Sequence, residues 1–318
     1  MISVVQLGRL DYAAGLRLQQ KLVGLRKAGQ VGDVLLLLEH APVITLGRNA
    51  KAANVLASPE LLAARGVEVY DCDRGGDVTF HGPGQLVGYP IFDLRGFSRQ
   101  PSAVSHQFAG DRSQVTGDRS QEQPAAVQEV TPLSTRKTLG AVDYVRRLEE
   151  VLIRTCADFG IPTRRVAGMT GVWTEAQGPS TRASSLRSGA LTRDDKEESL
   201  SEDGRREAKI AAIGVHISRS VTSHGFALNV NTDLSFFDLI VPCGIAAKPV
   251  TSIESELGRE VGMSAVAESV SRNFGSVFES QMLWVETIDA LLGNAVGVPV
   301  KAPAELRELH GEDDTAWA

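Results

Sequence analysis

The chain has little of what would commit it to a disulfide, metal or membrane architecture. Three of its 318 residues are cysteine, and Cys72, Cys156 and Cys243 are widely spaced, with no CxxC pair. This pattern argues against a disulfide framework and a structural zinc site. No apolar run approaches the roughly 18 residues of a membrane span. The N-terminal stretch "MISVVQLGRLDYAAG" also lacks the layout of a signal peptide, so we expect a cytoplasmic protein.

An excess of basic charge is missing as well. Lysine and arginine number 33 against 39 aspartate and glutamate, which gives a net charge of −6. This balance argues against nucleic acid or an anionic membrane as the main partner, because both favour basic surfaces. The hydrophobic content of 42% and charged content of 23% are typical of a globular protein. The length allows one large or two ordinary domains.

Large apolar side chains are scarce in two internal segments, residues 97–136 and 177–206. The first segment repeats "GDRSQ" at Gly110–Gln114 and Gly117–Gln121, and the second is mostly Ser, Arg, Asp and Glu. Such segments bury too little apolar surface to offset their chain entropy. We expect both to be disordered surface insertions, and we expect the tail after about Pro303 to be loose.

The rest of the chain alternates between strand and helix patterns. Extended patterns cover Asp33–His40, Pro42–Gly47, Val67–Asp71 and Val87–Leu94, and a strand pair is expected within 208–234. Helical spacing appears at Leu18, Leu22 and Leu25, from Val145 to Phe159, and from about Ser264 to Glu279. We predict an α/β (α+β) fold with a mixed, largely antiparallel sheet flanked by helices, and not a doubly wound parallel sheet.

Chemically active residue types are densest in "DRGGDVTFHGPGQLVGYPIFDL", from Asp73 to Leu94. Its glycines let the backbone approach a ligand closely. Arg74 is suited to hold a carbonyl or an anion, and His81 to orient a group or to titrate. The run fits neither GxGxxG nor GxxxxGK[ST], so nucleotide binding through those motifs is unsupported. A glycine-rich turn with a structural His81 stays open on these residues alone.

A second candidate segment, "AKIAAIGVHISRSVTSHGFALNVNTDL", begins with Lys209 near the head of a mostly apolar strand. Lys209 either snorkels at the strand end or lies near an apolar site. In the latter case it would act as a base or would stabilise a thiolate. His224 and His216 are read as structural and surface residues. Small side chains at Gly225 and Ala227 would leave room for a ligand.

The third segment, "VPCGI", places Cys243 between Pro242 and Gly244. With these flanks, we expect the thiol to be exposed on a bend and not buried within a helix or strand. From these residues alone, Cys243 can be either a buried apolar residue or a nucleophile. By contrast, Cys156 lies on the apolar stripe of a predicted helix and is expected in the core. Cys72, at a strand end, is expected to be a core residue or a spectator.

Together the segments resemble the lipoyl(octanoyl) transferase family of the biotin/lipoate protein ligase superfamily. The matching stretches are "EHAPVITLGR", which corresponds to the family's N-terminal strand pair, "RGGDVTFHGPGQLVGYP", "KIAAIGVHI", "HGFALNVNTDL", "PCGI" and "VTSI". They occur in the family's order and cover most of the chain apart from the two insertions and the C-terminal extension. Both insertions interrupt the family's spacing, and the second one separates "MTGVWTEA" from Lys209.

The resemblance implies a biotin/lipoate protein ligase-like catalytic domain over residues 1–260, followed by a helical extension and loose tail over 261–318. It implies transfer of an octanoyl group from octanoyl-acyl carrier protein to a lysine of a lipoyl domain, the first step of endogenous protein lipoylation. The acceptors would be 2-oxoacid dehydrogenase E2 subunits and the glycine cleavage H protein. No metal, cofactor or ATP is implied, and neither nucleic acid nor membrane is an implied partner.

The resemblance also assigns roles to residues. Cys243 would be the acylated nucleophile and Lys209 the active-site lysine. The implied substrate-binding residues are Arg74, Gly75, Gly76, Asp77, Val78, Thr79, Phe80, His81, Ala212, Ile213, Gly214, Gly225, Phe226 and Ala227. Transfer between a thioester and an amine through a protein thioester agrees with the general chemistry of cysteine nucleophiles.

Three other functions are compatible with parts of this sequence. An ATP-dependent lipoate or biotin protein ligase would share the fold, but the biotin-ligase loop GRGRxGR is absent. A thiol hydrolase would pair Cys243 with His81 or His224 and would release free acid. A non-catalytic acyl- or lipoyl-domain-binding protein would never carry an acyl group on Cys243.

Overall fold

The computed structural model describes residues 1–97, 138–175, 207–242, 248–288 and 290–291. The strands are β1 (Ile2–Leu10), β2 (Asp33–His40), β3 (Val43–Leu46), β4 (Glu68–Asp71), β5 (Val78–His81), β6 (Gln85–Ile91), β7 (Thr163–Val166), β8 (Met169–Thr174), β9 (Lys209–Ser218), β10 (Val221–Asn229) and β11 (Met282–Trp284). The helices are α1 (Tyr12–Lys27), α2 (Pro59–Ala64), α3 (Ala141–Asp158), α4 (Ile253–Leu257) and α5 (Met263–Val277), with short 3-10 turns η1 (Ala52–Asn54), η2 (Leu94–Gly96) and η3 (Leu234–Leu239).

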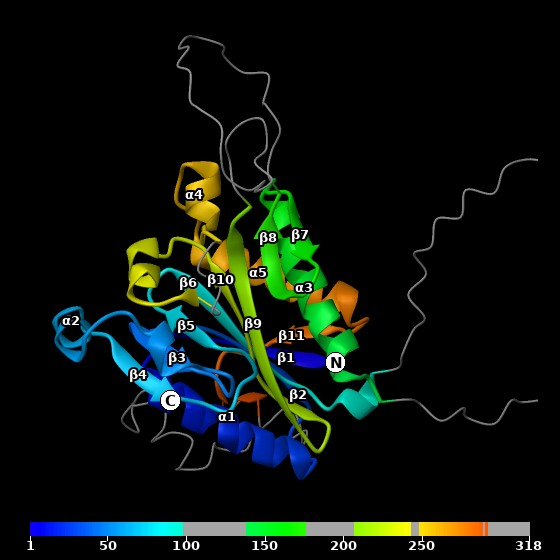
Figure 1. Ribbon diagram of the computed structural model, residues 1–318. Coiled ribbons are helices and arrows are strands. Elements are labelled where there is room, and N and C mark those ends of the chain that lie inside the picture. The colour runs from blue at the N-terminus through cyan, green and yellow to red at the C-terminus, as the bar shows by residue number, and fades with distance from the viewer. Residues whose placement is uncertain (98–137, 176–206, 243–247, 289, 292–318) are drawn as a thin grey trace, which may run out of the picture.

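The main sheet has eight strands in the order β11-β1-β2-β6-β10-β9-β8-β7. β1 pairs in parallel with both β11 and β2, and the remaining pairs are antiparallel. The predicted mixed, largely antiparallel sheet is therefore confirmed. Figure 1 shows this sheet running through the middle of the molecule with helices on its faces.

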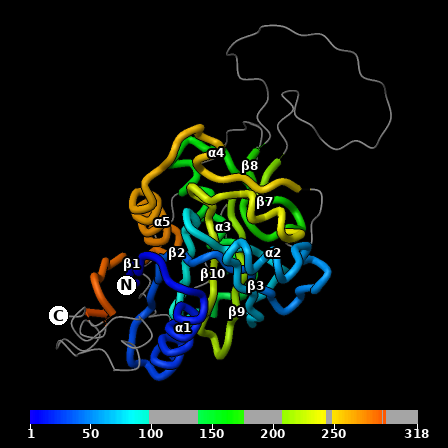
Figure 2. The backbone as a smooth tube through the Cα atoms, turned by 90° about the vertical axis from the view of Figure 1, so that its left-hand side faces the viewer, coloured from blue at the N-terminus to red at the C-terminus, as the bar shows by residue number. Residues whose placement is uncertain are grey.

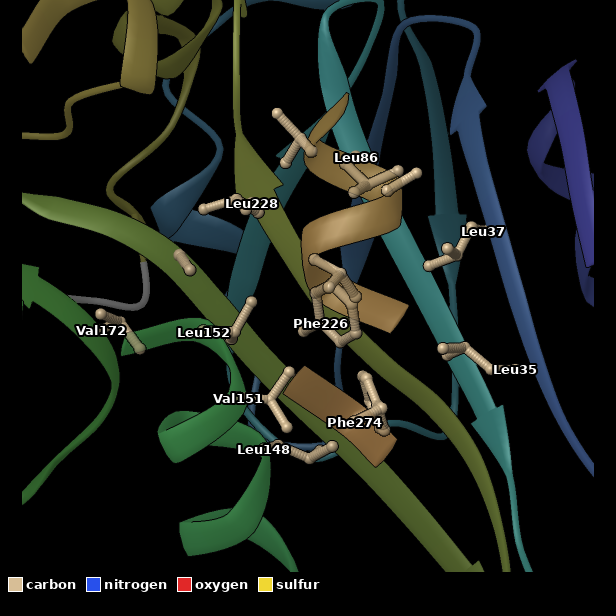
Figure 3. Packing of buried hydrophobic residues seen from close by; sticks show 14 of the residues in the cluster. Leu35, Leu37, Leu86, Leu148, Val151, Leu152, Val172, Phe226, Leu228 and Phe274 are labelled. Atoms are coloured by element: carbon tan, nitrogen blue, oxygen red, sulfur yellow. The ribbon is translucent and has the colours of Figure 1, made fainter. Parts of the chain in front are cut away.

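Both faces of the main sheet are buried, which explains why β2 reads as an uninterrupted apolar run. Leu35 and Leu37 of β2 join a core with α3 and α5, whereas Leu36 and Leu38 join a second core with α1. Figures 1 and 2 show α1 on the opposite side of the sheet from α3 and α5. Phe274 of α5 packs near Phe226 of β10 in the first core (Figure 3).

The predicted strand pair within 208–234 is the β9–β10 hairpin. Its register pairs Ser218 with Val221, so Arg219 and Ser220 form a two-residue turn. Both turn residues have positive φ, 51° and 66°, as expected for the turn type whose twist matches a hairpin. The hairpin brings the strand that begins at Lys209 next to the strand that carries His224.

The predicted helices are also present. Asp11 caps α1, because its carboxylate accepts a hydrogen bond from the Ala14 N–H at 2.8 Å. The apolar stripe predicted from Val145 to Phe159 is the buried face of α3, and Gly160 with φ of 76° follows its end. Cys156 is fully buried on that face, as expected.

A second, three-stranded sheet in the order β4-β3-β5 lies beside the main one. The predicted strands Asp33–His40 and Pro42–Gly47 are confirmed as β2 and β3; the chain bends at Ala41 and Pro42 between them, and β3 enters the second sheet. The predicted strand Val87–Leu94 also ends earlier, at Ile91, since Leu94 begins η2. Phe97, placed in the first insertion by its sequence, is buried against Phe92 and Phe278.

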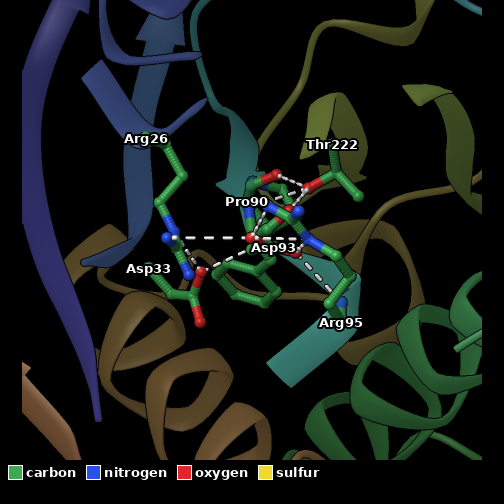
Figure 4. Close-up of polar contacts among 7 residues, drawn as sticks. Arg26, Asp33, Pro90, Asp93, Arg95 and Thr222 are labelled. Carbon is green, nitrogen blue, oxygen red and sulfur yellow. Dashed lines mark hydrogen bonds and ion pairs between the residues drawn. The ribbon is translucent and has the colours of Figure 1, made fainter. Parts of the chain in front are cut away.

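A polar network ties together the ends of β2, β6 and β10 (Figure 4). Asp33 Oδ1 accepts from Arg26 Nε and from the Asp93 backbone N–H, each at 2.8 Å. The buried Thr222 hydroxyl donates to the Pro90 carbonyl at 2.7 Å and accepts from the Phe92 N–H at 2.9 Å. These bonds satisfy backbone groups where the strands leave the sheet.

Candidate active site

A cavity of about 200 Å³ opens where the Asp73–Asp77 loop, β5, β6, α1, β9, β10 and the β7–β8 turn meet. Its lining combines apolar, hydroxyl, imidazole and cationic side chains: Tyr12, Arg74, Gly76, Asp77, Thr79, His81, Val87, Tyr89, Gly168, Met169, Thr170, Lys209, Ala212, Ile213, Gly214, His224, Gly225, Phe226 and Ala227. This composition is typical of a site that holds an apolar group and reacts at one end of it.

The loop that carries Arg74 packs directly on β9. The Gly75 N–H donates to the Val215 carbonyl at 3.0 Å. A Cβ at Gly214 would lie 2.7 Å from the Gly75 carbonyl oxygen and 3.1 Å from Arg74 Cδ. Glycine at 214 is therefore required by this close approach, which brings the loop to the cavity wall.

The guanidinium of Arg74 is buried and bonded to neutral oxygens. It donates to Thr45 Oγ1 through Nε at 3.2 Å and through NH2 at 2.9 Å, to the Thr45 carbonyl at 2.7 Å, and to the Gly75 carbonyl at 3.1 Å. Within the described part of the chain, no carboxylate forms an ion pair with Arg74. A positive charge at the cavity wall is thus available to a carbonyl or oxyanion of a bound ligand.

His81 is held neutral in a defined tautomer. The Gln85 amide nitrogen donates to Phe80 and Asn229, so Gln85 Oε1 accepts from His81 Nδ1 at 2.8 Å. His81 Nε2 then accepts from the Thr45 hydroxyl at 3.4 Å. Burial lowers the pKa of His81 to about 3, and the nearby charges of His40 and Arg74 act in the same direction.

The same network continues to the strand that carries Lys209. Gln85 Nε2 donates to Asn229 Oδ1 at 2.8 Å, and Asn229 Nδ2 donates to the Thr251 carbonyl at 2.9 Å. The Thr251 N–H in turn donates to the Lys209 carbonyl at 3.0 Å. Hydrogen bonds therefore run without a break from Arg74 through Thr45 and His81 to the backbone of Lys209.

Lys209 is 8% exposed and lies at the wall of the main cavity. Its ammonium sits 5.2 Å from the centroid of the buried Trp173 ring, and Lys248 Nζ lies 5.8 Å from the same centroid. A small cavity of about 20 Å³ adjoins this wall and is lined by Lys209, Pro242 and Val250, among others. Pro242 is the residue immediately before Cys243.

His224, which the sequence analysis treats as structural, also lines the main cavity. It adopts φ of 54°, unusual for a non-glycine residue in a strand. Its backbone N–H donates to Gln19 Oε1 and its Nε2–H to Asp73 Oδ1, at 2.8 and 2.7 Å. Burial lowers the pKa of His224, an effect only partly offset by Asp73.

Most of the predicted substrate-binding residues meet at the main cavity. Those that line it are Arg74, Gly76, Asp77, Thr79, His81, Ala212, Ile213, Gly214, Gly225, Phe226 and Ala227, together with Lys209. Val78 and Phe80 instead point into the core under the second sheet, because side chains alternate along β5. Gly75 lies behind the lining, at its contact with Val215. Cys243 lies outside the described residues.

Several residues that line the main cavity were not predicted from the sequence. Tyr12 comes from α1, Tyr89 from β6, Gly168 from the β7–β8 turn, and Met169 and Thr170 from the start of β8. Tyr12 carried no signal in its local sequence, because only the packing of α1 against the main sheet brings it to the site. Tyr89 belongs to the "GQLVGYP" stretch, so its place in that motif was the available hint.

Neither a metal site nor a membrane-spanning helix is found in the part of the chain that the structure describes. Its His, Cys, Asp and Glu side chains form no group of three suited to a metal ion. None of its helices combines the length and the apolar character needed to cross a membrane.

Most of the chain matches a known protein family and several of its members in sequence. The family model of the lipoyl protein ligase A/B catalytic domain matches residues 11–109 and 129–275. An octanoyltransferase of Koribacter versatilis is 49% identical over 313 residues, covering 98% of both chains. An octanoyltransferase of Acidobacterium capsulatum is 49% identical over 294 residues, covering 92% of this chain and 96% of the relative.

Solved structures agree at the level of the fold. The crystal structure of lipoate-protein ligase A bound with ATP matches with a TM-score of 0.56 and 12% identity, covering 100% of this chain and 98% of the other. A bipartite lipoate protein ligase of Thermoplasma acidophilum matches with a TM-score of 0.56 and 12% identity, covering 98% and 92%.

Proposed function

This chain belongs to the lipoyl protein ligase A/B catalytic-domain family and is an octanoyltransferase of protein lipoylation, and from that premise we propose that it transfers the octanoyl group through a thioester on Cys243. The donor in this proposal is octanoyl-acyl carrier protein, and the acceptor is a lysine of a lipoyl domain. We assign the catalytic machinery to residues 1–260; α5 and β11, which follow in the sequence, complete the first core and the edge of the main sheet.

The observation that carries the proposal is the junction of two cavities at Lys209. Thr79, Lys209, Ala212 and Ala227 line both the main cavity and the small cavity that Pro242 also lines. The main cavity offers apolar walls for an acyl chain, and the small one leads to the residue before Cys243. Because Lys209 lines both cavities, the proposal brings the Cys243 thiol and the acyl carbonyl together beside this residue.

In the first half-reaction of this proposal, the Cys243 thiolate is the nucleophile. A free thiol has a pKa near 8.5, and the Lys209 ammonium favours its thiolate. The thiolate attacks the thioester carbonyl, and Arg74 stabilises the oxyanion that forms. The carrier thiolate then leaves and takes a proton from Lys209, which becomes neutral.

The second half-reaction reverses the proton transfer. The neutral amine of the lipoyl-domain lysine attacks the Cys243 thioester and gives its proton to Lys209. The carbonyl re-forms, and the Cys243 thiolate is expelled. The net change is one thioester and one amine converted into one amide and one free thiol, so Lys209 and Cys243 return to their starting states.

The proposed location is the cytoplasm, where the proposed cysteine nucleophile would stay reduced. The two described cysteines, Cys72 and Cys156, are free. Burial raises the pKa of Cys156 to about 12, which makes this thiol a poor nucleophile at neutral pH.

The experiment that tests this function mixes the full chain with octanoyl-acyl carrier protein and a lipoyl domain, with no ATP present. We expect the lipoyl domain to gain the mass of one octanoyl group. A ligase that activates free octanoate would modify the domain only when ATP and octanoate are supplied. Release of free octanoate with an unmodified lipoyl domain would indicate a hydrolase instead.

A further inference from the structure

Glu149 is a fully buried carboxylate that the proposed chemistry does not use. It lies on the core face of α3, between Leu148 and the apolar pair Val151 and Leu152. An apolar side chain would fit this face at lower cost, because a buried carboxylate loses its hydration. The hydrogen bonds and ion pairs of the Glu149 carboxylate must therefore offset the cost of its burial.

The Glu149 carboxylate fills an irregularity between β7 and β8. Arg164 pairs with Trp173 and Val166 pairs with Met169, so Arg165 on β7 faces a longer stretch of β8 around Gly171. Such a bulge leaves backbone groups without a ladder partner. Glu149 Oε1 accepts from the Gly171 N–H at 3.2 Å, and Oε2 accepts from Arg165 Nε at 3.1 Å and from Arg146 NH1 at 2.7 Å.

Gly171 in turn sets the space in which the Lys209 side chain lies. It has φ of 122°, and a Cβ there would be 2.7 Å from Lys209 Cε and 2.6 Å from the Ala211 carbonyl oxygen. The pairing of β8 with β9 also shifts here, since Val172 faces Ala211 but Trp173 faces Lys209. Bulges of this kind redirect a side chain near a site.

We propose that Glu149 is a positioning residue for Lys209, acting through the Gly171 backbone. By holding the bulge from the α3 side, the carboxylate keeps Gly171 against the Lys209 stem and keeps the ammonium at the cavity wall. This inference rests on the proposed catalytic role of Lys209.

Glu150 provides a matched comparison on the same helix. It accepts from Arg165 NH2 at 2.8 Å and from Arg154 Nε at 2.9 Å, but its side chain is 33% exposed and has no hydrogen bond to Gly171. A variant at 150 therefore removes a carboxylate from the same arginine and leaves the hydrogen bond to Gly171 in place.

The test is a double-mutant cycle in the full chain between Glu149→Leu and Lys209→Ala. Acylation of the enzyme by octanoyl-acyl carrier protein is followed by intact mass. We expect Glu149→Leu to lower the rate constant of acylation by about tenfold to a hundredfold, with the donor concentration that gives half the maximal rate changed by less than about twofold. In the Lys209→Ala background the same change should slow the enzyme no further.

Two variants keep the result interpretable. Glu150→Gln should retain the wild-type rate, and melting temperatures identify any variant that does not fold. Should Glu149→Leu fail to fold, the cycle is run with Glu149→Gln, which keeps the side-chain length, and the same non-additivity is expected.

Equal loss of rate from the Glu149 change with and without Lys209 would overturn the positioning role, because Glu149 would then act independently. A wild-type rate in Lys209→Ala itself would overturn the role of Lys209 and with it this inference. These two failures are distinguished by the Lys209→Ala single variant alone.

Discussion

Gln85 and Asn229 face each other across the β6–β10 pair, and the Gln85 side-chain amide donates to Asn229 Oδ1 at 2.8 Å. The bond joins two halves of the site. Gln85 holds His81 on one side, and Asn229 reaches the Thr251 carbonyl on the other. The Arg74 side of the cavity and the Lys209 side are thereby fixed relative to each other.

Replacing Asn229 by leucine should therefore affect both stability and rate. The change leaves one N–H of the Gln85 amide and the Thr251 carbonyl without their partner, which costs about 1–3 kcal/mol of unfolding free energy. Urea unfolding and the octanoyl-transfer rate measure the two effects. Asn231→Leu is the control. The Asn231 amide donates to the Val261 carbonyl and accepts from the Val261 N–H, but it lies outside this network. It should lower stability and leave the rate of the folded enzyme intact, and an equal loss of rate in both variants would contradict the linkage.

The Thr222 hydroxyl in the network of Figure 4 should contribute to stability alone. Thr222→Val keeps the shape but removes the bonds to the Pro90 carbonyl and the Phe92 N–H. We expect a loss of about 1–3 kcal/mol in unfolding free energy. Thr222→Ser keeps the hydroxyl and should lose clearly less. A loss in Thr222→Val no greater than that in Thr222→Ser would contradict this prediction, because the hydrogen bonds would then contribute no more than the packing of the methyl group.

Stability should fall with acidification because two buried histidines are held neutral. Burial lowers the pKa of His40 to about 4 and that of His81 to about 3. Each lies below the unfolded value of about 6.5, so the unfolded chain binds protons first as the pH falls. Their contribution is complete above about pH 6.5 and is lost toward pH 3 to 4, at up to about 1.4 kcal/mol per pH unit for each histidine.

The measurement for the histidine prediction is the unfolding free energy between pH 7 and pH 4. His40→Gln should flatten the curve, since the titrating group is removed. A curve of unchanged slope in that variant would show that His40 is not responsible for the acid sensitivity.

Lys209 and Lys248 share the Trp173 ring, which makes them a matched pair for mutation. Lys209→Met should lower the octanoyl-transfer rate by about a hundredfold or more, the usual contribution of a general acid–base group. Lys248, which is ion-paired with Glu207, is assigned no catalytic role, so Lys248→Met should change the rate by less than about threefold. Comparable losses in the two variants would indicate a general effect of charge around Trp173.

Elements with strong local patterns were predictable from the sequence. The apolar stripe of α3 and the alternation in β9 and β10 are short-range signals that the tertiary structure does not override. The glycine-rich stretch from Arg74 to Gln85 likewise indicated a ligand site, because glycines let the backbone approach a ligand closely. The hairpin then brings Gly225 and Ala227 beside Ala212 and Gly214.

Residues that act through distant packing could not be found in this way. Thr45 is an ordinary strand residue until β3 places it under Arg74, and Glu149 looks like a solvated helix position until α3 covers the β7–β8 bulge. The placement of β3 in the second sheet has the same origin, since adjacency in the sequence does not decide which sheet a short strand joins. Contacts across 29 residues, as between Thr45 and Arg74, depend on the whole fold.

The most direct test of the central claim is the intact mass of the enzyme after mixing with octanoyl-acyl carrier protein in the absence of any acceptor. We predict that the wild-type chain gains the mass of one octanoyl group, that hydroxylamine removes it, and that Cys243→Ala gains none. Transfer at the wild-type rate by Cys243→Ala, or an adduct located on another residue, would contradict the account.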